Sequence, residues 1–151
     1  MIDFKFGENI INNGEFESGD TGWENIQCPE KCVAFDPTVS TNRLHLVGNG
    51  SWLVVRQYVP VKPDQKYKIT GSLQTIGITN TARFSYRWLN DNEALIANRP
   101  FGITSGTSEM TEYTSGPIIS PAEATHLEIN LRVNQGFGEA YFDNIRLEEV
   151  N

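Results

Sequence analysis

Apolar and polar side chains alternate most clearly between positions 126 and 134 of the chain. One side of an extended strand there is wholly apolar and consists of Leu127, Ile129, Leu131 and Val133. The other side is wholly polar and consists of His126, Glu128, Asn130, Arg132 and Asn134. Because successive side chains of a strand point to opposite faces, this pattern predicts one buried face and one wet face rich in groups that bind ligands.

A second alternating segment spans positions 82 to 89. Phe84, Tyr86 and Trp88 share one side of it, and Arg83 and Arg87 share the other. Alternation by itself does not say which side is the core. Three successive aromatic side chains most simply fill a core, with a sugar-binding platform as the alternative. The arginines are therefore expected to point outward.

The rest of the chain predicts an all-β domain, because long helical periodicity is absent and short runs of β-branched and aromatic residues lie between turn signals. Further strands are expected at 9–13, 31–35, 43–47, 52–61, 66–76, 110–119 and 139–149. This gives about nine strands, enough for a sandwich of two antiparallel sheets. The stretches 37–42 and 90–108 are expected to be loops.

Size and charge narrow the possible functions. A chain of 151 residues is long enough for a single domain, residues 1–151, with a real core. No apolar run of about 18 residues exists, so no membrane partner is expected. No signal peptide is visible at the start. The formal net charge of −7 and the lack of a basic stripe disfavour nucleic acid as a partner.

Cys28 and Cys32 are the only cysteines, and they stand on either side of a turn that contains Pro29. Either they form a small disulfide, if the backbone brings their Cα atoms within about 7 Å, or they are two free thiols. A secreted protein would favour the disulfide. His45 and His126 are too few and too far apart in the sequence to predict a zinc site.

The two ends of the chain carry matching signatures. Early in the chain comes an acidic turn, Asn12-Asn13-Gly14-Glu15-Phe16-Glu17, followed by Gly22-Trp23. The last segment, residues 140–147, contains Asp143. These acids could meet only if the fold brings its ends together, as a β-sandwich with adjacent first and last strands does. The pairing resembles the calcium-bearing β-jelly-roll carbohydrate-binding modules, the group around families 4, 9, 16 and 22, over essentially the whole chain.

A calcium site is the first implication of this resemblance. Ca²⁺ prefers six to eight oxygen ligands, and Glu17 and Asp143 are the candidate side chains. The resemblance adds the backbone carbonyls of Glu15 and Asn42 and implies that the ion is structural. The alternative is that these acids are solvated or cap turns.

A ligand groove on the concave sheet is the second implication. A sugar has an apolar face and a polar edge, so its site needs an aromatic platform and hydrogen-bonding side chains. The candidates are Trp52, Gln57, Arg83, Arg87, Asn130, Arg132, Asn134 and Phe137. As an alternative, Trp52 could be part of the core, where Trp23 is also expected, and the arginines could pair with surface acids. Arg132 stands where the family commonly has an uncharged amide. Because arginine also binds carboxylates with two hydrogen bonds, a glycan that contains uronic acids is a further alternative.

The chain is therefore expected to be a non-catalytic polysaccharide-binding module of a secreted glycan-degrading enzyme, acting as a monomer or as one domain of it. No nucleophile motif such as Gly-x-Ser-x-Gly is present. Two alternatives stay open. One is a structural or adhesive sandwich domain without a glycan site, and the other is a small glycan-active enzyme.

Overall fold

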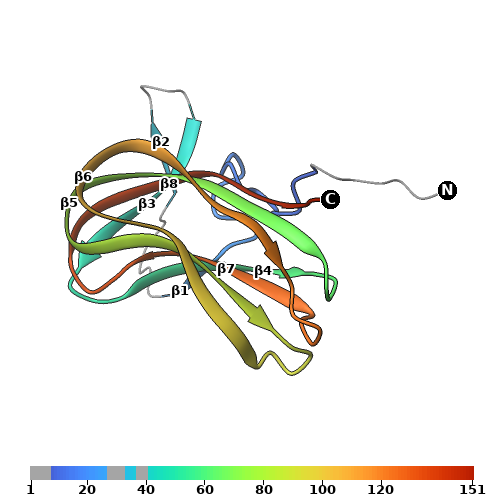
Figure 1. Cartoon of the computed structure of the whole chain (residues 1–151). Helices are drawn as coiled ribbons and strands as arrows, with labels where there is room; N and C mark the ends of the chain where they lie inside the picture. The colour runs from blue at the N-terminus through green and yellow to red at the C-terminus, as the bar shows by residue number, and fades with distance from the viewer. Residues whose placement is uncertain (1–7, 27–32, 37–40) are drawn as a thin grey trace.

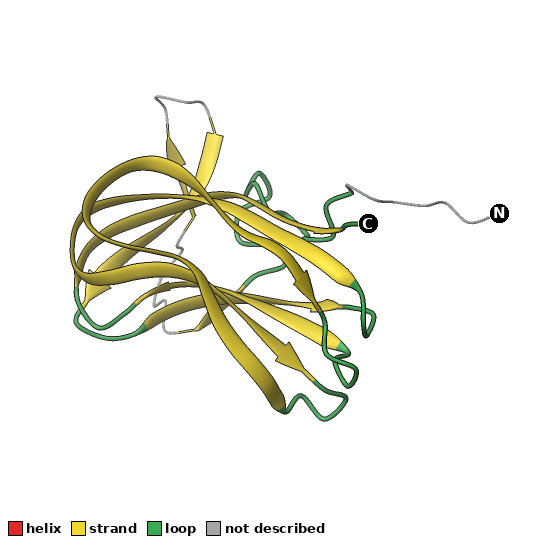
Figure 2. Cartoon of the chain, in the orientation of Figure 1, coloured by secondary structure: helices red, strands yellow, loops and turns green. Residues whose placement is uncertain are grey.

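The computed structural model describes residues 8–26, 33–36 and 41–151. Within these residues eight antiparallel strands form one curled sheet, as Figure 2 shows. Their order across the sheet is β1 (Glu24–Ile26), β4 (Leu53–Pro60), β7 (His126–Val133), β5 (Lys66–Leu89), β8 (Phe137–Glu149), β3 (Thr41–Asn49) and β2 (Val33–Asp36). The remaining strand, β6 (Leu95–Ile119), pairs with β5. The all-β class is confirmed, and no helix in the described residues is long and apolar enough to cross a membrane.

The long strand β5 turns this sheet into two layers. Residues 67–76 of β5 pair with β8, and residues 82–89 pair with β7. Between these halves the register with β6 shifts and Gly77 takes a φ of 62°, a value that glycine adopts without strain. Figure 1 shows β5 and β6 arching from one layer to the other. One layer therefore contains β1, β4, β7 and the second half of β5, and the other contains the first half of β5 with β8, β3 and β2.

The core lies between the layers and confirms both alternating patterns. Leu127, Ile129 and Leu131 of β7 are fully buried. From β5, the Phe84 ring meets the Phe142 ring of β8 edge-on, with 5.3 Å between the centroids. Each fully buried apolar side chain of this size contributes about 1.5–3 kcal/mol to folding, so these rows are the main force that holds the layers together. The three aromatic side chains of residues 84–88 fill the core and form no external platform.

The observed strands differ from the expected ones in several places. Residues 66–76 and 82–89 are the two halves of one strand, β5. The stretch 90–108, expected to be a loop, belongs from Leu95 onward to β6. This strand pairs with β5, and most of its side chains face solvent, so it needs no apolar alternation. The short strand β1 had no signal in the sequence.

The N-terminal segment meets the last strand, but the expected pair of adjacent first and last strands is wrong in that form. Residues 9–13 form turns instead of a strand, and β1 pairs with β4. Asn13 has a positive φ of 54°, which an extended strand does not allow. The Ile10 N–H donates to the Leu147 carbonyl at 2.7 Å, and the Ile145 N–H donates to the Gly14 carbonyl at 3.0 Å.

Gly14 is required at this junction, because a Cβ there would collide with the Ile145 carbonyl oxygen. Close by in the sequence, Phe16 is fully buried and its ring lies 5.4 Å from that of Trp23. Trp23 is 7% exposed, which confirms that it belongs to the core. The acidic turn is thus fixed against β8 by backbone hydrogen bonds and by a buried aromatic pair.

Candidate functional site

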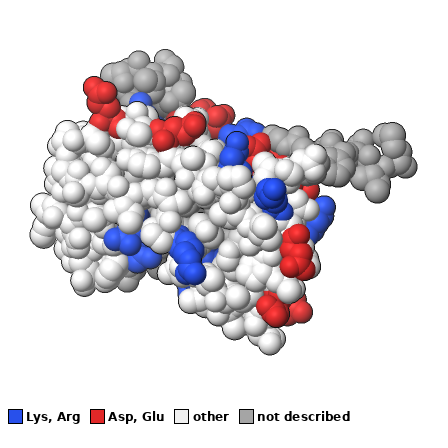
Figure 3. Space-filling model, in the orientation of Figure 1, with Lys and Arg blue, Asp and Glu red and all other residues white. Residues whose placement is uncertain are grey.

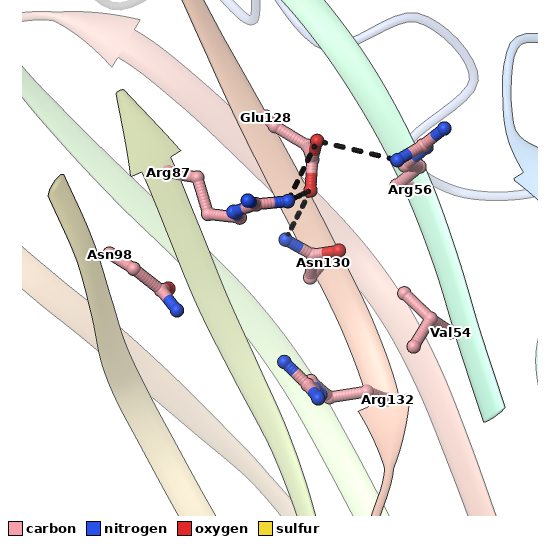
Figure 4. Close-up of a pocket in the computed structure, with 7 residues that line it drawn as sticks. All are labelled: Val54, Arg56, Arg87, Asn98, Glu128, Asn130 and Arg132. Carbon is pink, nitrogen blue, oxygen red and sulfur yellow. Dashed lines mark hydrogen bonds and ion pairs between the residues drawn. The ribbon is translucent and has the colours of Figure 1, made fainter. Parts of the chain in front are cut away.

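A cleft of about 350 Å³ opens on the outer face of the layer that contains β4 and β7. Its lining comes from four neighbouring strands and consists of Val54, Arg56, Arg87, Asn98, Glu128, Asn130 and Arg132 (Figure 4). The strand register explains this grouping. Arg87 of β5 lies opposite Glu128 of β7 and also opposite Asn98 of β6, while Arg56 of β4 lies opposite Asn130. Residues opposite each other in an antiparallel pair project to the same face.

Glu128 forms a charge-balanced centre at one end of the cleft. Its side chain is almost fully buried, with 1% of the residue exposed. An Arg87 Nη1 lies 3.2 Å from Oε2, an Arg56 Nη1 lies 3.6 Å from Oε1, and the Asn130 Nδ2 donates to Oε2 at 2.7 Å. Burial and the charge of Glu128 raise the pKa of the neighbouring Tyr58. The Arg56 Nε also lies 3.1 Å from Oε2 of the exposed Glu24. Glu128, Arg56, Arg87 and Asn130 hold one another in position, and the two acids together balance the two arginines at this end of the cleft.

The other end of the cleft holds arginines without a carboxylate. The Arg132 Nε donates to the Asn134 Oδ1 at 3.1 Å, and its Cζ lies 5.0 Å from the centre of the Trp52 ring. Arg83, directly opposite Arg132, donates from Nη2 to the Thr81 hydroxyl at 3.0 Å. Neither arginine forms an ion pair within the described part of the chain. Burial lowers the pKa of Arg132, and the charges of Arg83 and Arg87 lower it further.

The structure brings most of the expected ligand residues to this one face. Those that line the cleft are Arg87, Asn130 and Arg132. Those that flank them at the Arg132 end are Trp52, Arg83 and Asn134. Trp52 is 39% exposed, so its alternative assignment to the core is wrong. Phe137 is 59% exposed and packs over Gly50, apart from the lining residues.

Gln57 does not belong to this face. It lies opposite Ile129, which is a core residue, and is 6% exposed. Its Oε1 accepts a hydrogen bond from the Asn12 N–H at 2.9 Å, and its Nε2 donates to the Asn12 carbonyl at 2.9 Å. Both hydrogen-bonding ends of the amide are therefore occupied by the N-terminal segment. Gln57 is a structural residue that ties β4 to the acidic turn.

The polar face of β7 is also less wet than its alternation suggested. Glu128, Asn130 and Asn134 are 1%, 3% and 5% exposed. Arg56 of β4 and Arg87 of β5 pair with Glu128, which is therefore no ordinary surface acid. Asn134 accepts a hydrogen bond from Arg132 and donates one to the Thr81 hydroxyl. Sequence reasoning missed Arg56 and Asn98. Placing Asn98 required β6 to be recognised as a strand, and placing Arg56 required the register of β4.

The expected calcium ligands lie around the acidic turn and the last strand. Asp143 of β8 is 7% exposed, and its pKa is raised to about 6, mainly by burial. The charges of Glu15 and Glu17 also raise this pKa, whereas the Asn144 N–H and the charge of Arg43 lower it. Asn42 lies in β3, next to β8. No three His, Cys, Asp or Glu side chains gather as a metal cluster within the described ranges. A buried acid among acids fits a cation in charge, and backbone carbonyls would have to complete the ligands. Cys28 and Cys32 lie outside the described residues.

No protein family profile matches the chain, and no curated protein sequence matches it. Solved structures do resemble it. A xylan-binding domain of carbohydrate-binding module family 22 from Paenibacillus barcinonensis is 15% identical, with a TM-score of 0.72 and 99% of each chain covered. A family 16 carbohydrate-binding module is 20% identical, with a TM-score of 0.65, covering 92% of this chain and 99% of the other.

A viral protein has the same fold in one of its parts. The enzymatically active domain of tailspike protein 4 from bacteriophage CBA120 is 16% identical, with a TM-score of 0.75 over 94% of this chain. This chain spans about a fifth of that structure, 21% of its length. The chain thus has the β-jelly-roll fold of carbohydrate-binding modules of families 4, 16 and 22, as the terminal signatures indicated.

Proposed function

We propose that this chain is a non-catalytic module that binds a polysaccharide in the cleft between β4 and β6. The observation that carries this proposal is the set of polar side chains held rigidly across the cleft, with the exposed Trp52 ring at its end. Sugar hydroxyls are read by such fixed amides and guanidinium groups, and the apolar face of a sugar ring stacks on an aromatic side chain. Solved structures of this fold include xylan-binding domains, which supports a glycan as the partner.

Binding without hydrolysis agrees with the chemistry of the cleft. Glycoside hydrolysis commonly uses two carboxyl groups that flank the bond to be cleaved. The cleft lining described above holds one carboxylate, Glu128, and two arginines and an amide already occupy it. Held in this way, Glu128 is poorly placed to donate a proton or to attack a sugar.

The module would act by tethering. We expect it to be a monomer or one domain of a secreted enzyme, as in the similar structure from Clostridium thermocellum, which combines a family 22 module with a xylanase module. Holding an enzyme on its polymer raises the effective concentration of substrate without lowering the barrier of the reaction.

A glycan array followed by affinity electrophoresis tests this function. Wild type should bind one polymer class, and Arg132→Ala should bind it about tenfold or more weakly, because a charged hydrogen-bonding partner is worth about 1.5–3 kcal/mol. Arg146→Ala, on the other layer, makes the same change of charge and should bind as the wild type does. Equal binding by wild type and Arg132→Ala would place the groove elsewhere.

A structural or adhesive domain without a glycan site is the second candidate, and the phage tailspike shows that this fold also occurs as one part of a larger viral protein. In that case the folded protein would bind nothing on a broad glycan array. Retained melting behaviour together with the absence of any glycan signal would support this candidate over a binding module.

We propose further that one structural Ca²⁺ lies between the acidic turn and β8, with carboxylates of Glu17 and Asp143 and carbonyls of Glu15 and Asn42 as ligands. The raised pKa of Asp143, caused by burial and by two neighbouring acids, supports a cation there. When bound, the ion would supply positive charge beside Asp143 and would fix the N-terminal segment against the last strand.

A further inference from the structure

The cleft is basic although the chain is acidic. The formal net charge of the chain is −7, yet Arg56, Arg87 and Arg132 line the cleft around a single carboxylate, and Arg83 stands beside them. Glu128 pairs with Arg56 and Arg87, and Glu24 also pairs with Arg56. Figure 4 shows the contacts of Glu128 as dashed lines and shows Arg132 without one. In Figure 3 acidic groups gather along the upper edge of the molecule, while two basic patches at the lower left have no acidic atoms beside them.

Arg83 and Arg132 form an unfavourable pair in the free protein. They are directly opposite each other on neighbouring strands, and both are partly buried. Like charges in this position destabilise a sheet. Within the described residues the buried Arg83 Nε has no hydrogen-bond partner, and neither has the buried Ser85 Oγ, two residues further along β5. Buried polar groups are normally paired, so these two atoms show that the polar side chains beside the cleft are incompletely satisfied in the free protein.

Granting the polysaccharide-binding function proposed above, we propose that Arg83 and Arg132 form a carboxylate-binding subsite at the Trp52 end of the cleft. The glycan that binds there is a polysaccharide that contains uronic acids, called a polyuronate below whether its uronic acids are continuous or are spaced by neutral sugars. One uronic acid carboxylate lies between the two guanidinium groups, and a sugar ring lies beside Trp52.

The cleft itself shows how such a carboxylate is held. Glu128 is enclosed by two arginines from neighbouring strands and by an amide on its own strand. Arg83, Arg132 and Asn134 repeat these components at the other end, without the carboxylate. The planar guanidinium fork matches a carboxylate with two parallel hydrogen bonds, which a neutral hydroxyl cannot offer.

The charge of Glu128 also sets the orientation of the ligand. A carboxylate at the Glu128 end would find both arginines already paired with Glu128, whereas the Arg132 end holds positive charge without an acidic partner in the described residues. The Glu128 end therefore accepts neutral parts of the glycan, through hydroxyls on Arg87, Asn98 and Asn130. The two ends together select a chain on which charged and neutral groups are spaced along the cleft.

Matched pairs of polymers test the carboxylate directly. Polygalacturonate, alginate and glucuronoxylan are each titrated calorimetrically against their own carboxyl-reduced forms, with sulfated carrageenan as a second anion and neutral β-glucan and mannan for comparison. At least one polyuronate should bind, and its reduced form should bind about tenfold or more weakly, the loss expected for a charged hydrogen-bonding partner. Binding of the acidic polymer should weaken as salt screens the interaction.

Variants assign the effect to the two arginines. Arg83→Gln and Arg132→Gln should each weaken binding of the polyuronate about tenfold or more. Their melting temperatures should stay equal to that of the wild type or rise, because either change removes the repulsion across the strands. This combination separates a ligand contact from a structural role. Arg146→Gln changes the net charge equally on the other layer and should leave binding unchanged.

Each other outcome is decisive. Binding of neutral polymers alone would overturn the carboxylate subsite and leave the proposed function standing. Equal binding of carrageenan and polyuronate would overturn it in favour of anions in general. Unchanged polyuronate binding in both arginine variants would place the carboxylate elsewhere. No binding to any glycan on the array would overturn the proposed function and the subsite together.

Discussion

Two buried carboxylates, one in each layer of the sandwich, have opposite surroundings. Glu128 of β7 is 1% exposed and contacts two arginines and an amide. Asp143 of β8 is 7% exposed, and the one hydrogen bond that its side chain makes within the described residues comes from the adjacent Asn144 N–H at 2.8 Å. Its charged neighbours are Glu15, Glu17 and Arg43, so the nearby acids outnumber the base.

The difference shows that burial alone does not define the role of an acid. A buried charge is costly unless it is paired, and of these two acids only Glu128 forms ion pairs within the described residues. Glu128 therefore serves as an anchor that fixes Arg56 and Arg87 across the cleft. For Asp143, burial raises the pKa to about 6, so this carboxyl is suited to a partner from outside, such as a cation.

Breaking the compensated site should have the largest effect on stability. Glu128→Gln removes the shared negative charge, which leaves Arg87 without an ion pair in the described residues and Arg56 with the exposed Glu24 alone. We expect the free energy of unfolding to fall by about 3 kcal/mol in urea titrations, the lower end of the range for a broken buried ion pair, since both arginines reach solvent. Glu109→Gln, an exposed acid on β6, should change it by less than about 0.5 kcal/mol. Equal stability of the two variants would show that the charges of Glu128 and its arginines are not coupled.

The contribution of Asp143, the carboxylate without an ion pair in the described residues, should make the stability of the protein depend on pH. With a pKa raised to about 6 in the folded state and the usual value of 3.8 when unfolded, metal-free Asp143 holds its proton more tightly in the native protein. Its contribution to stability is therefore complete below pH 3.8 and is lost as the pH rises through about 6. The loss is on the order of 3 kcal/mol.

Asp143→Asn should remove this pH dependence and make the metal-free protein more stable at pH 7. Adding Ca²⁺ at pH 7 should stabilise the wild type by about 2.7 kcal/mol at a hundredfold excess over Kd, which raises its melting temperature. The melting temperature of the variant should stay unchanged. Melting curves with EDTA and with CaCl₂ check both statements. A wild type that ignores Ca²⁺ but keeps the pH dependence would disprove the metal site alone.

Removing a buried neutral side chain that has hydrogen-bond partners, Gln57, should lower stability less than removing the charge of Glu128. Gln57→Ala leaves the Asn12 N–H and carbonyl without their partners, so the free energy of unfolding should fall by about 1–3 kcal/mol. Glycan affinity should stay that of the wild type, since Gln57 lies on the opposite face from the cleft. A loss of affinity with full stability would contradict the assignment of Gln57 to the core side.

The smallest expected effect concerns the aromatic border of the cleft. Trp52→Ala removes the ring that Arg132 covers and that a sugar would contact. Cation–π contacts at exposed sites are worth about 0.5–1 kcal/mol, so stability should change little. Glycan affinity should fall by a few-fold in calorimetric titration. Phe137→Ala, an exposed aromatic side chain away from the cleft lining, should leave affinity unchanged.

The sequence predicted what strand alternation determines locally. In residues 126–134 and 82–88 apolar and polar side chains alternate with a period of two, so the residue types alone assigned the core set and the polar set correctly. Cleft residues Arg87, Asn130 and Arg132 came from the same reasoning, because the face of a side chain follows from its position in the strand. The end motifs indicated the jelly roll by another route, through their resemblance to carbohydrate-binding modules.

Tertiary structure alone decided the features that depend on pairing. In β4, Val54 and Val55 are both apolar and Arg56 and Gln57 are both polar, so alternation does not set the phase of the strand. The register with β7 sets it, and places Arg56 in the cleft and Gln57 against Asn12. Likewise, β6 is a strand because it pairs with β5 along the edge of the sheet, where hydrogen bonding and not burial selects the conformation.

The charge balance of the cleft was decided at the same level. Sequence supplied Glu128, Arg56 and Arg87 as separate residues far apart along the chain. Whether an acid is solvated, paired or unpaired depends on which strands lie beside it, and the strand order β4-β7-β5 brought both arginines to Glu128. Composition thus determined the net charge of the protein, and the fold determined where that charge is compensated, because electrostatic interactions act across space and not along the chain.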